Sequence, residues 1–155
     1  MGGMTKRIAL ATGELYRAMS QLQGEVKKAS ANAGLDVKLI ELVKMRASQI
    51  NGCAYCLDMH AAEAVAAGES PRRLYVLEGW RETDLFTEQE RAALAYTEAM
   101  TRISDHKDVP EDVYAEAVRV FTEDQHRALA WCVVAINTWN RLMVASHAEL
   151  PERAE

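Results

Sequence analysis

The pattern of apolar and polar positions along the chain predicts an all-α protein. From about Thr5 to Ser30, apolar residues recur every three or four positions, which is the period of an amphipathic helix. The stretch from Asp36 to Asn51 is apolar on more than one side, so we expect a central helix there with Asp36 as its N-cap. No stretch alternates apolar and polar residues as a half-buried strand would. The chain is therefore expected to fold as a helical bundle.

Helix start and stop signals divide the rest of the chain. Asn51-Gly52 ends the central helix, because glycine readily takes the left-handed conformation that closes a helix. Thr87 and Thr122 each open a capping box, in which the threonine hydroxyl and a Glu or Gln three residues later accept from free backbone N–H groups. Further helices are expected over about 53–67, briefly after Ser70-Pro71, and over about 88–103, 110–121 and 123–148.

Length and composition indicate one domain over residues 1–155. The 155 residues are enough to bury a core, and 49% hydrophobic with 26% charged residues is typical of a soluble globular protein. A net charge of -5 without a basic stripe argues against nucleic acid as a partner. We expect no membrane span, because no apolar run approaches about 18 residues. The N-terminus lacks the pattern of a signal peptide, which favours a cytoplasmic location.

The candidate chemistry lies in the helix predicted to begin near Cys53. Cys53 and Cys56 are spaced i,i+3, and Cys56 and His60 are spaced i,i+4, so two thiols and an imidazole share one helical stripe. A helix N-terminus favours the thiolate of Cys53. A Cys-x-x-Cys pair can close a disulfide and later release the electrons. If the Asn-Gly turn folds the preceding helix back, the carboxylate of Glu41 reaches His60 and orients its ring.

These effects favour different sulfurs as the attacking thiol. The helix dipole favours Cys53 but is worth only about 0.3–1 kcal/mol at an exposed site. Assistance from a general base is worth ~10²–10⁴-fold in rate, and His60 is one helical turn from Cys56. On magnitude we predict that Cys56 attacks and Cys53 resolves, with His60 and Glu41 completing the catalytic set.

The ordered set of Glu41, Cys53-x-x-Cys56 and His60 resembles the motif of the alkylhydroperoxidase D (AhpD) family, within the carboxymuconolactone decarboxylase superfamily. The similarity extends over about 35–68 and reappears weakly at 136–142. The resemblance implies an AhpD-like all-α fold, trimers or hexamers, and peroxide reduction by the second cysteine of the pair. It also implies a carboxylate–imidazole proton relay and a resolving disulfide. The family pattern has a histidine just before its second cysteine, where this chain has Tyr55.

We therefore expect a peroxiredoxin-type alkylhydroperoxidase that reduces a small hydroperoxide and is regenerated by an external thiol or disulfide reductant. No flavin, haem or nucleotide motif is visible, so no bound cofactor is expected. A symmetric homo-oligomer, trimer or hexamer, is expected from the resemblance. Unusually apolar stretches at 35–50 and 129–144 also favour it, because such helices need more cover than one small chain gives.

Other interpretations remain open. Cys53, Cys56 and His60 could belong to a zinc site, although structural zinc usually has four protein ligands. The two cysteines could be core residues without a role. The protein could be a decarboxylase or isomerase acting on a lactone or small acid, with His60 and Glu41 as acid and base. It could also be a redox sensor that forms the disulfide without turnover.

Other notable residues of the C-terminal helix are expected to be structural. Cys132 lies among apolar residues and is expected in the core, because burial is the usual state of a free cysteine. Asn137, Asn140 and Arg141 are expected to cap or pair within the core.

Overall fold

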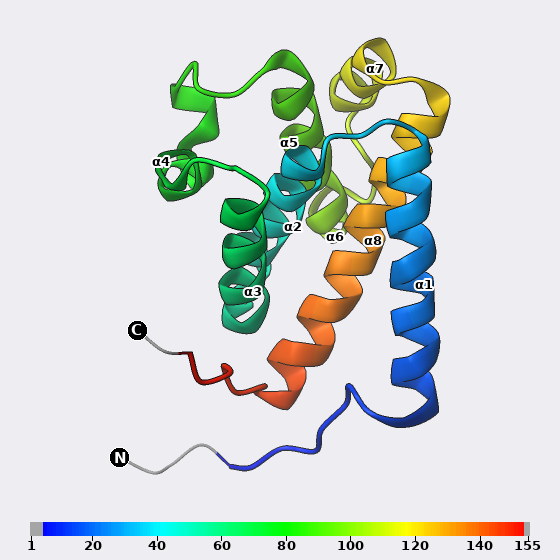
Figure 1. Cartoon of the computed structure of the whole chain (residues 1–155). Coiled ribbons are helices and arrows are strands. Elements are labelled where there is room, and N and C mark those ends of the chain that lie inside the picture. The colour runs from blue at the N-terminus through cyan, green and yellow to red at the C-terminus, as the bar shows by residue number, and fades with distance from the viewer. Residues whose placement is uncertain (1–4, 154–155) are drawn as a thin grey trace.

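The computed structural model describes residues 5–153, and within this range the chain is helical and contains no strand (Figure 1). The elements in chain order are α1 (Gly13–Asn32), α2 (Val37–Asn51), α3 (Ala54–Ala66), α4 (Pro71–Tyr75), the 3₁₀-helix η1 (Leu77–Glu82), α5 (Glu88–Thr101), α6 (Ile103–His106), α7 (Glu111–Val120) and α8 (Glu123–Ser146). The all-α prediction is confirmed.

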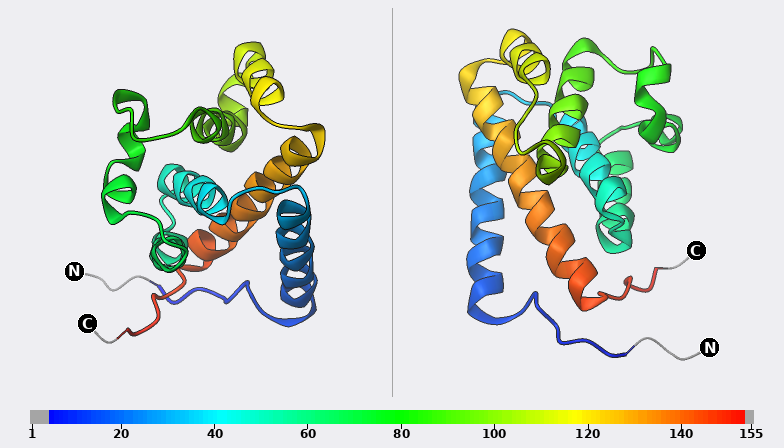
Figure 2. Two further views of the ribbon diagram at one scale, coloured as in Figure 1. Left: turned by 45° about the horizontal axis from the view of Figure 1, so that its top comes forward. Right: turned by 180° about the vertical axis from the view of Figure 1, so that it is seen from behind.

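Helix α2 is the centre of the bundle. It packs against α3, α5 and α8, and α8 packs in turn against α1. Figure 2 shows α1 and α8 side by side at one edge of the molecule and α4 with η1 at the opposite edge. Leu42 and Val43 of α2 are almost completely buried. Burial on several sides explains why the sequence of α2 is apolar on more than one face.

The apolar core consists of three clusters. The largest joins α1, α2, α5, α7 and α8. A second joins α2, α3, α4, η1 and α5. The third is small and contains Ala47, Cys53, Cys56 and Ile136. It places both cysteines of the Cys-x-x-Cys pair inside the protein, between α2, α3 and α8.

A buried carboxylate, Glu98 of α5, joins three elements. Its Oε1 accepts from Arg46 Nε of α2 and from Trp80 Nε1 of η1, each at 2.9 Å. Its Oε2 accepts from Arg81 at 2.6 Å. Burial opposes ionisation of Glu98, but the hydrogen bonds from Trp80, Arg81 and Arg46 outweigh it and lower the pKa of this carboxyl. The cluster therefore holds a charged group inside the bundle.

The helix ends marked by capping residues lie where the sequence predicts them. Asp36 Oδ1 accepts from the Lys38 N–H at 2.7 Å and caps α2. Gly52 ends the same helix in the left-handed conformation, with φ 67° and ψ 34°. Both capping boxes, at Thr87 and Thr122, have both of their hydrogen bonds. These predictions are confirmed.

The predicted start of the first helix at Thr5 is wrong. The helix begins at Gly13, because Thr12 is extended and Gly13 has a φ of +73°, outside the right-handed helical range. Residues 5–12 are mostly exposed, and Ile8 is 83% exposed. A short amphipathic segment without a surface to cover its apolar side is not a stable helix. Arg7 instead donates to the Ala145 carbonyl at 3.1 Å, beside the end of α8.

Other helix ends also differ from the prediction. Helix α8 ends at Ser146 instead of 148, because His147 takes the left-handed conformation with φ 51°. Helix α5 ends at Thr101, and a non-helical Arg102 separates it from α6. No capping residue marks η1, and this 3₁₀-helix was not predicted.

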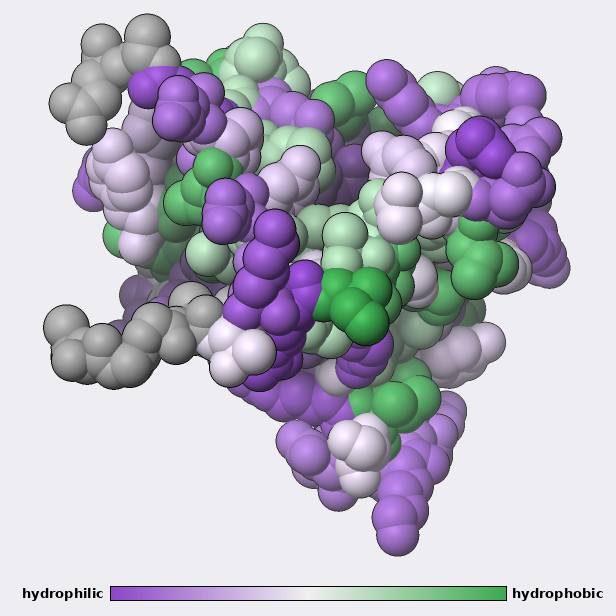
Figure 3. Space-filling model, turned by 90° about the horizontal axis from the view of Figure 1, so that it is seen from below, coloured by the Kyte–Doolittle hydropathy of each residue, from purple (hydrophilic) through white to green (hydrophobic). Residues whose placement is uncertain are grey.

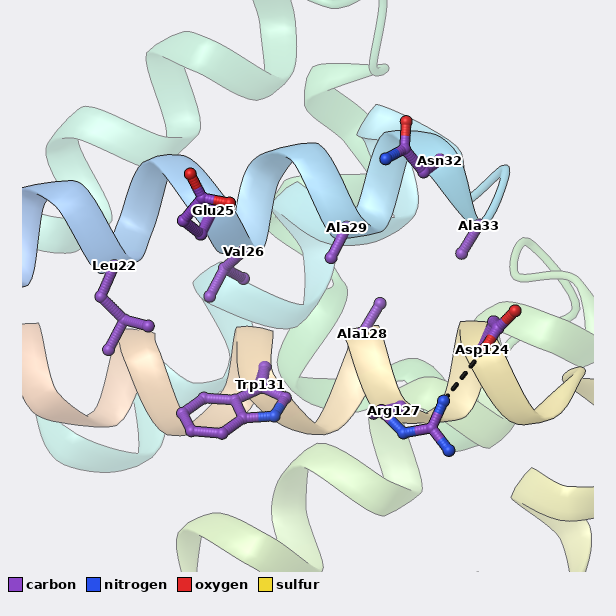
Figure 4. Close-up of a pocket in the computed structure, with 10 residues that line it drawn as sticks. All are labelled: Leu22, Glu25, Val26, Ala29, Asn32, Ala33, Asp124, Arg127, Ala128 and Trp131. Carbon is purple, nitrogen blue, oxygen red and sulfur yellow. Dashed lines mark hydrogen bonds and ion pairs between the residues drawn. The ribbon is translucent and has the colours of Figure 1, made fainter.

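The surface carries an apolar groove of about 480 Å³ between α1 and α8 (Figure 4). Val26, Ala128 and the half-exposed Trp131 line it, and the ion pair of Asp124 with Arg127 lies at one end. None of the residues singled out for chemistry lines this groove. On the face seen from below, hydrophobic side chains reach the surface among hydrophilic ones (Figure 3).

Helix α8 is long and apolar enough to cross a membrane by length and composition, a property that core helices of soluble proteins share. Here it opens with a capping box and packs against α1, α2, α3, α5 and α7. These contacts make α8 a packed helix of the bundle.

Candidate functional site

The turn at Gly52 sets the direction in which α3 leaves α2. Its left-handed backbone would strain any side chain, whereas glycine adopts it freely. The next N–H, of Cys53, donates to the Ser48 carbonyl at 3.0 Å, which completes the closure of α2. Cys53 thereby becomes the N-cap of α3, and Glu41 of α2 comes to lie beside His60 of α3.

Cys53 and Cys56 are free thiols, each only 1% exposed. Cys53 Sγ accepts a hydrogen bond from the Cys56 backbone N–H at 3.4 Å, in the position that a Ser, Thr or Asp oxygen usually takes. The predicted helix-terminal Cys-x-x-Cys pair is present. The first sulfur therefore lies where the backbone of α3 offers unpaired donors.

The two sulfurs have opposite charge preferences. The pKa of Cys53 is lowered to about 6, because hydrogen bonds from the Cys56 side chain, the Cys56 N–H and the Asn140 amide favour its thiolate against the opposing effect of burial. Charge on His60 adds to this effect. The pKa of Cys56 is raised, because its thiol donates to Cys53 and because burial and the Cys53 charge oppose a second anion. Near neutral pH the pair holds one negative charge and one proton.

Glu41 and His60 form a buried hydrogen-bonded pair. His60 Nδ1 lies 3.0 Å from Glu41 Oε2, so the structure brings together the two residues that the sequence paired. Lys44 Nζ lies 3.2 Å from Glu41 Oε1. Burial opposes ionisation of Glu41, but the hydrogen bond with His60 and the charge of Lys44 outweigh it, and the pKa of Glu41 is lowered. A carboxylate therefore lies against the imidazole.

Glu63 joins this pair and was not singled out in the sequence. Its Oε2 lies 3.1 Å from His60 Nδ1, and its side chain is half-exposed. The i,i+3 spacing of His60 and Glu63 on one helix was a signal that could have found it. Glu63 connects the buried Glu41–His60 pair to the solvent.

The structure does not support one contact on which the sequence argument relied. Among the described residues, no hydrogen bond joins Cys56 to His60, although both lie on α3 and both are buried. The charge of His60 acts on Cys53, whose pKa it lowers. The assignment of Cys56 as the attacking thiol rested on that contact and stays a prediction.

A chain of amide hydrogen bonds links α8 to the last turn of α2, just before the cysteine pair. Asn51 Nδ2 donates to Oδ1 of Asn137 and to Oδ1 of Asn140, at 2.9 Å each. Asn140 Nδ2 donates to Ser48 Oγ at 3.0 Å, and Asn140 is completely buried. The expected pairing within the core is confirmed for Asn140, whereas Asn137 is half-buried and Arg141 pairs with it at the exposed surface. The influence of Asn140 on the sulfurs was not predicted, because it depends on how α8 crosses α3.

The Glu41, His60 and Glu63 side chains are also the one group of three potential metal donors found in the described range, with their donor atoms within 4.8 Å of one another. The ammonium of Lys44 already supplies positive charge there. The cysteines do not join His60 in such a group. The zinc alternative for Cys53 and Cys56 thus lacks a third donor among the described residues.

Cys132 is a core thiol, as expected. It packs within the largest apolar cluster, and its sulfur lies 3.2 Å from Ser30 Oγ. Burial raises the pKa of Cys132, which keeps it protonated and unreactive. It offers a matched control for the reactive pair.

Comparisons with known proteins identify relatives in sequence. Residues 13–99 match the model of the Carboxymuconolactone decarboxylase family. The chain is also 36% identical over 121 residues to the uncharacterized protein YdfG of Bacillus subtilis, which covers 78% of this chain and 82% of that protein.

Two solved structures share the fold. A protein of unknown function from Agrobacterium tumefaciens, suggested to be the antioxidant defence protein AhpD, is 34% identical and has a TM-score of 0.87 over 96% of this chain and 100% of its own. An uncharacterized peroxidase-related protein from Silicibacter sp. TM1040 is 22% identical and has a TM-score of 0.72 over 84% of this chain and 67% of its own. The expected AhpD-like fold is confirmed.

Proposed function

The chain belongs to the carboxymuconolactone decarboxylase family, and from this premise we propose that it reduces small alkyl or hydrogen peroxides with its cysteine pair. Family and fold support an activity that is peroxidase-related or decarboxylase-like. The choice between the two rests on the site. An external thiol or disulfide reductant returns the oxidised pair to the dithiol form.

One observation carries the proposal, namely that two buried free thiols lie together at the start of α3, with Cys53 Sγ accepting from the Cys56 backbone N–H. Cys53 carries the charge and Cys56 the proton, with the charge of His60 acting on Cys53. A pair of this kind supplies a nucleophile, a proton and a resolving thiol in one place. The Glu41–His60 pair supplies a group that can give a proton to the departing oxygen.

In the proposed first step, Cys56 Sγ attacks the hydroxyl oxygen of the peroxide while its proton passes to Cys53 Sγ. An S–O bond forms and the O–O bond breaks, so the sulfur loses two electrons and becomes a sulfenic acid. The departing alkoxide takes a proton from protonated His60 and leaves as an alcohol. Glu41 holds the ring and stabilises its charged form.

In the proposed second step, Cys53 attacks the sulfenic acid sulfur of Cys56. The S–S bond forms, the S–OH bond breaks, and the Cys53 proton leaves with the hydroxide as water. His60 carries that proton between the two groups. The external dithiol then supplies two electrons and two protons, and the disulfide returns to the resting pair.

The lowered pKa of Cys53 supports the opposite order of attack. A thiolate that already exists needs no proton transfer before it reacts. In that case Cys53 becomes the sulfenic acid and Cys56 resolves it. The overall reaction is the same, and the two orders differ only in the residue on which the intermediate forms.

The main test replaces each cysteine of the pair. Cys53→Ser and Cys56→Ser are each expected to lose peroxide turnover by at least about 10³-fold, because each removes one of the two sulfurs of the disulfide. With Cys56 attacking, only Cys53→Ser accumulates a sulfenic acid, measured by dimedone trapping and mass spectrometry. Accumulation in Cys56→Ser instead assigns the attack to Cys53.

Cys132→Ala is the matched control and should keep full turnover, because Cys132 is a core thiol away from the pair. Undiminished turnover in both variants of the pair would exclude thiol peroxidase chemistry.

The Glu41–His60 pair itself favours a second candidate, a decarboxylase-like reaction on a lactone or small acid. A buried carboxylate on an imidazole is an acid–base pair that needs no sulfur. In that case turnover of the acid survives complete alkylation of the thiols. A third candidate, a redox sensor, consumes peroxide only once per protein and shows no turnover with added reductant.

The assembly remains part of the proposal. We expect a homotrimer or homohexamer, in which exposed apolar side chains such as Trp131 and Val134 of α8 are covered by another copy. Sedimentation or light scattering measures the number of chains directly.

A further inference from the structure

We infer that the side-chain amide of Asn140 is a positioning group for the thiolate of the cysteine pair. A chain of hydrogen bonds orients this amide, because the donor and the acceptor in each bond cannot exchange roles. The inference deepens the proposed function, and its catalytic meaning rests on that function. It can be tested without peroxide, because it concerns the charge of the resting thiols.

The direction of the chain is set at Asn137. Its Nδ2 donates to the Val133 carbonyl at 2.9 Å, and a carbonyl can only accept. Its Oδ1 accepts from Arg141 Nη1 at 2.8 Å, and a guanidinium can only donate. Both ends of the Asn137 amide are therefore fixed by groups that cannot exchange roles.

This fixed orientation passes through Asn51 to Asn140. Because Oδ1 of Asn137 is an acceptor, the Asn51 atom 2.9 Å away must be Nδ2. The same Nδ2 lies 2.9 Å from Asn140, which must present its Oδ1. The Asn140 Nδ2 then lies on the other side and donates to Ser48 Oγ at 3.0 Å. Ser48 can accept because its own proton goes to the Lys44 carbonyl at 2.7 Å.

Among the described residues, the second N–H of Asn140 has no oxygen acceptor. Asn140 is one helical turn from Ile136 and Met143, and these two residues pack in the cluster that contains Cys53 and Cys56. A completely buried N–H requires an acceptor, and we assign it to the sulfurs of that cluster. In agreement, hydrogen bonding from Asn140 lowers the pKa of Cys53 and offsets part of the rise in the pKa of Cys56.

Because the amide acts on both sulfurs, it stabilises the single negative charge of the pair on either of them. Asn140 has no proton to exchange at neutral pH and takes no part in bond formation, so it is a positioning residue. A stabilised thiolate also favours the reduced form, which makes the disulfide easier to reduce. Asn140 therefore contributes both to the resting charge and to the redox balance of the site.

The experiment measures the thiol pKa from the ultraviolet absorbance of the thiolate as a function of pH, in the fully reduced protein carrying Cys132→Ala. Asn140→Leu has a similar volume and no donor. It is expected to raise the lower thiol pKa from about 6 by about one unit, a tenfold loss of thiolate below that pKa. The disulfide should become about 30 mV harder to reduce in a glutathione equilibrium.

A second variant keeps Asn140 and frees its orientation. Asn51→Ala removes the donor that fixes the Asn140 oxygen, so the amide can turn and the pKa should rise by less than in Asn140→Leu. The exposed Asn32→Leu on α1 is the matched control and should leave the pKa unchanged. An unchanged pKa in a folded Asn140→Leu variant overturns the inference. Should that variant not fold, an unchanged pKa in Asn51→Ala overturns it instead.

Failure of the inference and failure of the proposed function are distinguishable. A shifted pKa in a protein without peroxide turnover keeps the role of Asn140 and rejects the peroxidase. Full turnover with an unshifted pKa keeps the peroxidase and rejects the role of Asn140.

Discussion

Glu41 and Glu98 are both buried carboxylates, on the neighbouring helices α2 and α5, and they differ in their partners. Glu98 accepts from Arg46 and Trp80, which stay donors at any pH in the folding range. Glu41 faces His60, whose ring nitrogens can each donate or accept. Burial opposes the charge on both carboxylates, and in both cases the partners lower the pKa.

The difference shows that a lowered pKa does not by itself identify a reactive carboxylate. An arginine keeps a carboxylate in its charged form. At Glu98 this contact also fixes the packing of α2, η1 and α5. An imidazole lets the same kind of carboxylate take part in proton transfer. We therefore expect Glu98 to stabilise the fold and propose that Glu41 takes part in proton transfer, and variants of the two can separate these roles.

The largest expected effect is on stability, in Glu98→Ala. Removing this carboxylate leaves the buried Arg46 guanidinium without its partner, which typically costs about 3–5 kcal/mol. The free energy of unfolding in urea measures the loss. A change below about 1 kcal/mol would mean that the arginines bind solvent or other partners. Glu98 would then not have the stabilising role that distinguishes it from Glu41.

A somewhat smaller effect is expected on turnover, in Glu41→Gln. The amide keeps the size of the side chain but cannot stabilise a protonated His60, so peroxide turnover should fall roughly 100-fold. Steady-state kinetics with a coupled reductant measures it. Glu98→Gln is the matched control, since its folded fraction should keep the wild-type rate. Equal rate losses in the two variants would remove the distinction.

The smallest effect is expected for Glu63→Gln. Glu63 contacts the same His60 nitrogen as Glu41, but its side chain is half-exposed and screened by solvent. Turnover should stay within about fivefold of the wild-type value. A loss as large as that of Glu41→Gln would show that the exposed carboxylate is the main partner of the imidazole, and that burial does not decide the role.

Sequence reasoning located the helix ends that depend on a few neighbouring residues. The caps at Asp36, Gly52, Thr87 and Thr122 are local chemistry and need no knowledge of the fold. The start of the first helix was wrong because periodicity continues before Gly13, whereas the bundle offers no surface to cover that segment. A helix end of that kind is decided by tertiary packing.

In the site, too, the contacts set by local spacing were predictable and those set by tertiary packing were not. The contact of Glu41 with His60 followed from spacing and from the glycine turn between their helices. The part played by Asn140 did not, because that residue lies on α8 and reaches the sulfurs only through tertiary packing. From the sequence, the stabilisation of the Cys53 thiolate by the N-terminus of α3 was estimated for an exposed residue. Cys53 is buried, and the low-dielectric interior strengthens the interaction of the helix end with the thiolate.

In the proposed reaction Cys53 has two roles, since the sulfur that exchanges electrons is also the hydrogen-bond acceptor at the first turn of α3. A disulfide sulfur is neutral and a weaker acceptor than a thiolate, so oxidation is expected to weaken the hydrogen bond from the Cys56 N–H. Backbone amide protons at the beginning of α3 should then exchange with deuterium faster in the oxidised protein than in the reduced one. The start of α3 would thus be less protected only in the oxidised protein, which is the form that a reducing partner binds.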